Sequence, residues 1–195
     1  MALLLTGLAA AVAALSHLQV PDAASSLTSG TPLEALREDG HDDAHGTAAG
    51  AVPDGTSAFD DHVPGVAKLD PELLGALRQA ASAAQGEGVG LLVDSGWRSP
   101  AYQQRLLEEA VAKYGSAAEA GRWVATPATS AHVAGEAVDV GPPAAAAWLG
   151  QRGAAFGLCQ VYRNEPWHFE LRPGTADHGC PPLYADPTED PRMQP

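Results

Sequence analysis

The sequence has few basic residues and few cysteines. Its 195 residues include 11 Lys and Arg against 24 Asp and Glu, which gives a net charge of −13. Because binding to phosphate backbones needs clustered Lys and Arg, this balance argues against nucleic acid as a partner. The two cysteines, Cys159 and Cys180, lack the C-x-x-C spacing of a metal or redox pair. In a secreted protein an isolated pair indicates one disulfide, with two buried free thiols as the alternative.

A long hydrophobic run is also missing. The apolar stretch from Ala2 to Leu15 is shorter than the ~20 residues that cross a bilayer, and it matches the core of a secretory signal. No Lys or Arg precedes the stretch, so an uncleaved anchor that extends through Val20 stays open. We therefore expect residues 1–20 to be a secretory signal or weak anchor. We also expect the protein to be secreted or in the cell envelope, with membrane contact only through this segment.

Residues 21–61 lack hydrophobic periodicity. They are rich in Ala, Ser, Thr, Gly and Asp, and residues 22–61 hold nine acids against a single base, Arg37. Such a composition cannot offset the entropy lost on ordering, so we expect a disordered acidic linker. The Pro-rich residues 181–195 are expected to be a flexible tail for the same reason. One folded domain, expected to be a monomer, is then predicted over residues 62–180, a length that can fold alone.

This central region opens with strong helix signals. The segment Asp70-Pro71-Glu72 combines an N-cap acid with proline at the first helical position, and an apolar stripe follows as far as Gly86. Ser99-Pro100 starts a second helix, and another is expected over residues 144–152. Strands are expected over residues 89–93, 136–140, 156–163 and 167–171. Helices followed by antiparallel strands indicate an α+β domain, with a small antiparallel sheet and flanking helices.

Two further segments indicate metal chemistry. The stretch Ser130–Asp139 contains His132, and Glu165-Pro166-Trp167-His168 follows downstream. Two imidazoles and one short carboxylate are the ligands of a catalytic zinc site, which keeps a fourth position open for water. A second carboxylate, on Glu165, remains as the general base. Because Pro166 disfavours a helix interior, Glu165 must lie on a turn before the strand that carries His168.

A third segment suits recognition of a substrate terminus. It reads Ser95-Gly96-Trp97-Arg98-Ser99, with Gln103 beyond it, and it places Arg98 at a strand-to-helix turn. A guanidinium binds a free terminal carboxylate through two parallel hydrogen bonds. The alternative for Arg98 is a surface ion pair.

In this order, over roughly residues 63–172, the three motifs resemble the VanY-type zinc D-alanyl-D-alanine carboxypeptidases. The resemblance implies a compact α+β domain that holds one Zn²⁺ on its sheet. Ser130 is assigned to the substrate by the resemblance, although it could instead be only a turn residue. The implied site residues are the metal ligands His132, Asp139 and His168, the catalytic base Glu165, and the substrate-binding residues Arg98, Gln103 and Ser130.

The activity that this resemblance implies is hydrolysis of peptidoglycan stem peptides with removal of the C-terminal D-alanine. Within the enzyme class, an L,D-carboxypeptidase, a D,D-dipeptidase or a cell-wall endopeptidase are the alternatives. A non-catalytic zinc-containing binding module of the same fold is the alternative from another class. The presence of Glu165 argues against that module, because a binding protein has no need for a base beside the metal.

Overall fold

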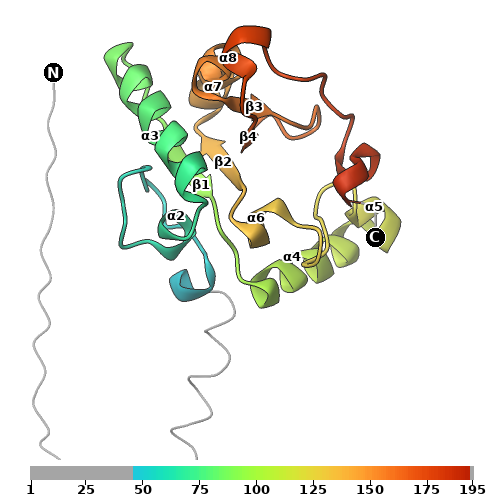
Figure 1. The fold of residues 1–195 in the computed structure, drawn as a ribbon. Coiled ribbons are helices and arrows are strands. Elements are labelled where there is room, and N and C mark those ends of the chain that lie inside the picture. The colour runs from blue at the N-terminus through green and yellow to red at the C-terminus, as the bar shows by residue number, and fades with distance from the viewer. Residues whose placement is uncertain (1–45, 194–195) are drawn as a thin grey trace, which may run out of the picture.

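Four short antiparallel strands form the central sheet, in the order β1-β2-β4-β3 (Figure 1). The computed structural model describes residues 46–193 of the chain. The strands are β1 (Leu92–Ser95), β2 (Ala137–Gly141), β3 (Leu158–Gln160) and β4 (His168–Leu171). Together with the helices around them they confirm the α+β class. The strands differ by a few residues from the predicted ranges, because pairing with a neighbour rather than local composition sets where each one ends.

Two helices pack on one face of this sheet, α3 (Pro71–Gly86) and α7 (Pro143–Arg152). As the sequence predicts, Asp70 caps α3 by accepting backbone hydrogen bonds from Glu72 and Leu73. None of the helices in residues 46–193 is long and apolar enough to cross a membrane. The remaining elements are η1 (Thr47–Ala49), α2 (Pro64–Ala67), α4 (Pro100–Tyr114), α5 (Ala117–Ala120), α6 (Ala131–Ala134), η2 (Gly153–Phe156), α8 (Thr175–His178), η3 (Pro187–Glu189) and η4 (Pro191–Met193).

Alternation along β2 and β4 separates the hydrophobic core from a polar face. Val138, Val140 and Phe169 are buried among the residues of α3 and α7. Their neighbours along the strands, Asp139 and His168, point to the opposite face because successive side chains of a strand alternate. In the β2–β4 ladder these two residues are direct partners. The sheet therefore brings together two motifs that are far apart in the sequence.

The folded domain begins earlier than the predicted linker allows. Ala49 and Ala58 are buried, and backbone hydrogen bonds join Ser99 N to Ala49 O (2.8 Å) and Val93 N to Thr56 O (2.9 Å). Residues 46–61 are thus packed onto the domain, contrary to expectation. Single alanines and irregular backbone make these contacts, so no periodic pattern marks them. The predicted secretory segment and residues 21–45 of the linker lie outside the described residues.

The C-terminal region also differs from the expected flexible tail. A disulfide joins Cys159 in β3 to Cys180, which confirms the predicted pairing. Beyond it, Tyr184 forms a parallel bridge with Tyr162, and the described chain ends beside α5 (Figure 1). Charged side chains with partners inside the domain, Asp186 and Asp190 among them, also hold this region in place. Such contacts do not show in the composition, which by itself indicates a flexible tail.

Candidate metal centre and substrate pocket

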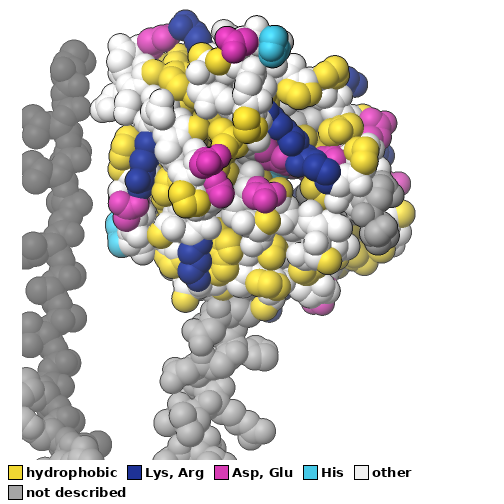
Figure 2. Space-filling model, viewed as in Figure 1, with side chains coloured by type: hydrophobic (Ala, Val, Ile, Leu, Met, Phe, Trp, Pro, Cys, Tyr) yellow, Lys and Arg dark blue, Asp and Glu magenta, His cyan; other side chains and the backbone are white. Residues whose placement is uncertain are grey.

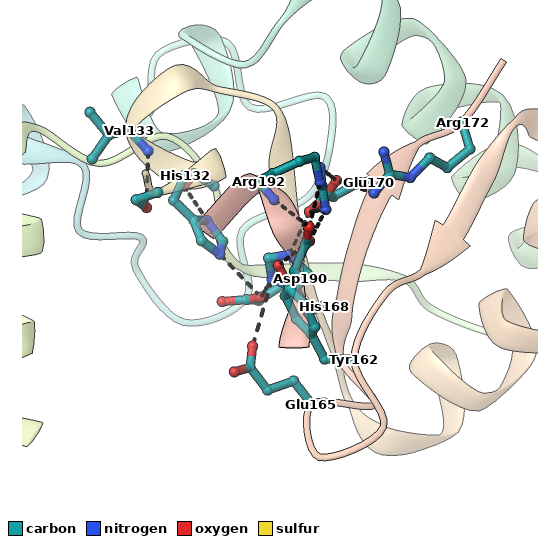
Figure 3. A network of polar contacts seen from close by, with 12 residues as sticks. His132, Val133, Tyr162, Glu165, His168, Glu170, Arg172, Asp190 and Arg192 are labelled. Atoms are coloured by element: carbon teal, nitrogen blue, oxygen red, sulfur yellow. Dashed lines mark hydrogen bonds and ion pairs between the residues drawn. The ribbon is translucent and has the colours of Figure 1, made fainter. Parts of the chain in front are cut away.

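The polar face of the sheet gathers three metal-ligating side chains. Asp139 projects from β2, His168 from the paired position of β4, and His132 from α6, which leads into β2. One ligand atom from each of these buried residues lies within 4.8 Å of the others. Figure 3 shows the His132 and His168 imidazoles close together, with their ring centroids 5.1 Å apart.

Local backbone structure aims His132 at the site. Ser130 caps α6 by accepting a hydrogen bond from Val133 N (3.4 Å), and Gly135 ends the helix with φ +78°. A Cβ at Gly135 would lie 2.7 Å from the carbonyl oxygen of Lys68, so only glycine fits there. His132 Nδ1–H donates to Gly96 O (2.8 Å), which leaves Nε2 facing Asp139 Oδ1 at 3.4 Å.

His168 is oriented in the complementary way. Its Nε2–H donates to Glu170 Oε1 (3.3 Å), and its Nδ1 lies 3.2 Å from Asp139 Oδ1. Both imidazoles therefore use one nitrogen for a protein acceptor and turn the other toward Asp139. This arrangement is typical of histidines that bind a metal, because the outer hydrogen bond fixes the tautomer and the ring orientation.

The three groups shift one another's pKa values. Burial lowers the pKa of His132, and the nearby Arg98 guanidinium lowers it further. Burial would also lower the pKa of His168, but hydrogen bonds with Asp139 and Glu170 outweigh it and raise that pKa to about 9. Burial acts to raise the pKa of Asp139, yet the two histidines hold it well below its ordinary value. A positive charge is therefore stabilised beside the Asp139 carboxylate.

These residues fit a divalent zinc ion. Ligand atoms bound at about 2.0–2.2 Å around a tetrahedral ion lie about 3.3–3.5 Å apart, close to the 3.2 and 3.4 Å from Asp139 Oδ1 to the two imidazoles. Two nitrogens and one oxygen are a donor set that zinc accepts, and three protein ligands leave a position for water or substrate. The metal role of His132, Asp139 and His168 remains a prediction for experiment.

Glu165 supplies a second carboxylate at the same place. It lies on the turn before β4, where His168 N donates to Glu165 O (3.1 Å), and its Oε2 is 3.8 Å from His168 Nδ1. Although Glu165 is only 7% exposed, its Oε1 has no hydrogen-bond partner within residues 46–193. Burial raises the pKa of Glu165 to about 7, against the opposing effect of His168. Such a carboxylate is suited to accept a proton near neutral pH.

Arg98 lies beside the ligands rather than on the surface. Its Nη2 donates to Asp139 Oδ2 (3.0 Å), Nε to Ser95 Oγ (2.9 Å) and Nη1 to Gln103 Oε1 (3.1 Å). These bonds use three of the five N–H groups of a guanidinium. Gln103 is 1% exposed and donates through Nε2 to Ala125 O (2.9 Å). Gln103 therefore links the Arg98 guanidinium to the backbone at Ala125 and holds it in position.

All seven predicted site residues line a single cavity of about 240 Å³. The prediction from sequence omitted several of its walls, including Tyr162 and the C-terminal Pro187 and Met193. It also omitted Glu170, the hydrogen-bond partner of His168. A carboxylate two residues after a strand histidine lies on the same face of the strand, and this spacing was the available signal. Nothing in the sequence pattern connects the C-terminal residues with the motifs.

Comparison with known proteins agrees with this geometry. The model of the family described as VanY, D-alanyl-D-alanine carboxypeptidase, matches residues 66–173. A D-alanyl-D-alanine carboxypeptidase of Enterococcus faecalis (strain ATCC 700802 / V583) is 32% identical over 127 residues, which are 52% of this chain and 47% of that protein. The match thus spans about half the length of this relative.

Three solved structures show the same fold. A mutant of the vancomycin-resistance D,D-pentapeptidase VanY, from a VanB-type cassette and in complex with Zn(II), is 30% identical with a TM-score of 0.50, covering 53% of this chain and 72% of that chain. VanYB in complex with D-alanine-D-alanine has the same identity and TM-score and covers 53% and 71%. The LD-carboxypeptidase LdcB, at 23% identity and a TM-score of 0.51 over 64% and 68%, shares the fold. The chain belongs to the VanY family of D-alanyl-D-alanine carboxypeptidases.

Proposed function

We propose that the domain is a zinc-dependent peptidase that removes the C-terminal D-alanine from peptidoglycan stem peptides. The observation that carries the proposal is the buried Glu165 carboxylate, with one oxygen unpartnered among the described residues, beside the His132–Asp139–His168 cluster. Support for the substrate comes from family membership and from a similar structure solved with D-alanine-D-alanine.

Zinc, when bound by His132, Asp139 and His168, would polarise the scissile carbonyl and lower the pKa of water at the site. Glu165 accepts the proton of the attacking water and passes it to the leaving amine. In the metal-free protein, burial raises the pKa of Glu165 to about 7, and burial likewise favours proton uptake by this carboxylate during the reaction. His132 and His168 are held in fixed tautomers by Gly96 O and Glu170.

Arg98 recognises the substrate terminus. Two of its N–H groups remain for a carboxylate after its three hydrogen bonds to protein groups. The polar ring of Ser95, Gln103 and Asp139 around the guanidinium holds it at the cavity wall. A substrate bound by its terminal carboxylate here would have its last peptide bond near Glu165, which is what an exopeptidase requires.

On the face drawn in Figure 2, acidic and basic side chains are mixed with hydrophobic ones, so this face has no extended patch of one charge. We also propose that the domain acts outside the cytoplasm. The Cys159–Cys180 disulfide supports this location, because such bonds persist in oxidising compartments.

A panel of defined stem peptides tests the proposal. The zinc-loaded protein is incubated with peptides ending in D-alanyl-D-alanine, in a single D-alanine after an L-centre, and in crosslinked form, and the products are identified by mass. Release of one D-alanine from the D,D peptide is expected. Cleavage of only the L-centre peptide or of the crosslink would replace the proposal with the L,D-carboxypeptidase or the endopeptidase, and zinc binding without turnover would favour the binding module.

A further inference from the structure

The last described residues of the chain contact Glu170, the hydrogen-bond partner of His168. We refer to residues 186–193, which include η3 and η4, as the C-terminal strap. Arg192 in the strap contacts both carboxylate oxygens of Glu170, from Nη1 to Oε2 (2.6 Å) and from Nη2 to Oε1 (3.2 Å). This two-point contact is the strong geometry of a guanidinium with a carboxylate. Figure 3 shows Arg192 and Glu170 side by side, above His168 in this view.

Glu170 connects the strap to a metal ligand. Its Oε1, which accepts the hydrogen bond from His168 Nε2 (3.3 Å), also accepts one from Arg192. Glu170 is 2% exposed, and a buried carboxylate is costly unless cations and donors surround it. Arg172 also pairs with it, at Oε2 (2.9 Å). Arg192 donates a hydrogen bond to the oxygen facing His168 and so restrains it.

The strap itself is firmly attached. Asp190 is fully buried; it accepts hydrogen bonds from Arg192 Nε (3.0 Å) and from the Tyr162 hydroxyl (3.1 Å). The Tyr162 ring lies 5.1 Å from the His168 ring, between centroids. At the start of the strap, Asp186 pairs with Arg122 (2.9 Å). Ion pairs at both ends thus hold Arg192 in place.

We propose that Arg192 is a positioning residue for the metal ligand His168. By fixing the Glu170 carboxylate, it fixes the direction of His168 Nε2–H and so keeps Nδ1 turned toward Asp139 and the cavity. The inference rests on the proposed function, because it gives Nδ1 the task of binding zinc. It makes the C-terminal strap a part of the metal centre, although the strap begins 18 residues after His168.

Zinc affinity is the measurement that tests this role. The full chain and its Arg192→Ala and Arg192→Lys variants are titrated with zinc against a chromophoric chelator, and visible spectra of the Co²⁺-loaded proteins report the ligand geometry. Arg192→Ala should weaken zinc binding roughly 10–100-fold, as expected for loss of an outer-shell partner, and should alter the Co²⁺ spectrum. Arg192→Lys should recover part of the affinity. The matched control is Arg152→Ala, which removes an exposed arginine paired with Glu87 and should bind zinc as wild type does.

A folded Arg192→Ala protein with wild-type zinc affinity and an unchanged Co²⁺ spectrum would overturn the inference. If that variant does not fold, as judged by circular dichroism, Glu170→Gln replaces it; this variant keeps the side-chain shape and should lose at least about tenfold in zinc affinity. Wild-type affinity in Glu170→Gln would then reject the inference. A wild-type protein that binds no zinc and cleaves no stem peptide would instead contradict the proposed function.

Discussion

At the scale of single residues, Glu165 has the clearest chemical role. Glu165→Gln should keep zinc bound, because His132, Asp139 and His168 are untouched, yet lower kcat by about 10²–10⁴-fold, since an amide does not accept the proton. Steady-state kinetics on a D-alanyl-D-alanine peptide, with zinc content measured in parallel, checks this. Turnover near the wild-type rate would remove Glu165 from its proposed role.

The raised pKa of Glu165 also has a consequence for stability in the metal-free protein. Its ordinary value of 4.5 rises to about 7 on burial, so the folded state binds this proton more tightly than the unfolded state does. The contribution of Glu165 to folded-state stability is therefore greatest below pH 4.5 and is lost as pH rises through about 7, by up to roughly 3 kcal/mol. Metal-free Glu165→Gln should thus have a higher Tm than wild type at pH 8. At pH 5 the two should differ little, and an equal difference at both pH values would contradict this.

Arg98 allows a test of exopeptidase character. Amidation of the substrate C-terminus should lower kcat/KM of the wild type by more than about tenfold, because a charged hydrogen bond contributes roughly 1.5–3 kcal/mol. Arg98→Ala should lose activity on the free acid and show little further loss on the amide. Arg98→Lys should recover only part, since a point charge lacks the planar two-point contact. Equal cleavage of acid and amide by the wild type would point to an endopeptidase.

At the scale of elements, the predictable parts of the fold are those with local signals. Capping residues and proline marked the starts of α3 and α4, and the motifs placed His132, Asp139 and His168 on or beside strands. The residues from 46 to 61 and the C-terminal strap escaped prediction because tertiary contacts hold them, through small buried alanines and through ion pairs such as Arg192–Glu170. Such contacts leave no periodicity in the sequence.

The α6–β2 connection provides a prediction at this scale. Gly135 and Gly88 share φ +78°, but a Cβ at Gly135 would meet Lys68 O at 2.7 Å, whereas Gly88 has no neighbour within 4 Å. Gly135→Ala should lower the free energy of unfolding by about 1–3 kcal/mol and weaken zinc binding by displacing His132. Gly88→Ala, the matched control, should show only the smaller conformational cost and normal zinc binding. Denaturant unfolding and zinc titration of both variants decide the point, and equal effects would refute it.

At the scale of the whole molecule, the disulfide encloses the turn that carries Glu165. The bond between Cys159 and Cys180 spans 21 residues of sequence, and the closed loop contains Glu165, His168 and Glu170. Closing a loop of this length stabilises a protein by about 3 kcal/mol in the chain-entropy model. The Cys159→Ala/Cys180→Ala protein should therefore melt at a lower temperature. Adding a reductant should lower the Tm of the wild type but not of the variant, and an unchanged wild-type Tm in a fully reduced sample would argue against this contribution.

The pairing of β2 with β4 also has a meaning for folding. With Asp139 opposite His168, the polar side chains face the cavity and Val138 and Phe169 face the helices. A slip of one residue would exchange the two faces. It would carry the Asp139 carboxylate into the apolar layer without its imidazole partners and leave Val138 beside the polar cluster. The residues proposed to bind the metal therefore also stabilise the native strand register during folding, because the shifted register would bury a carboxylate without partners.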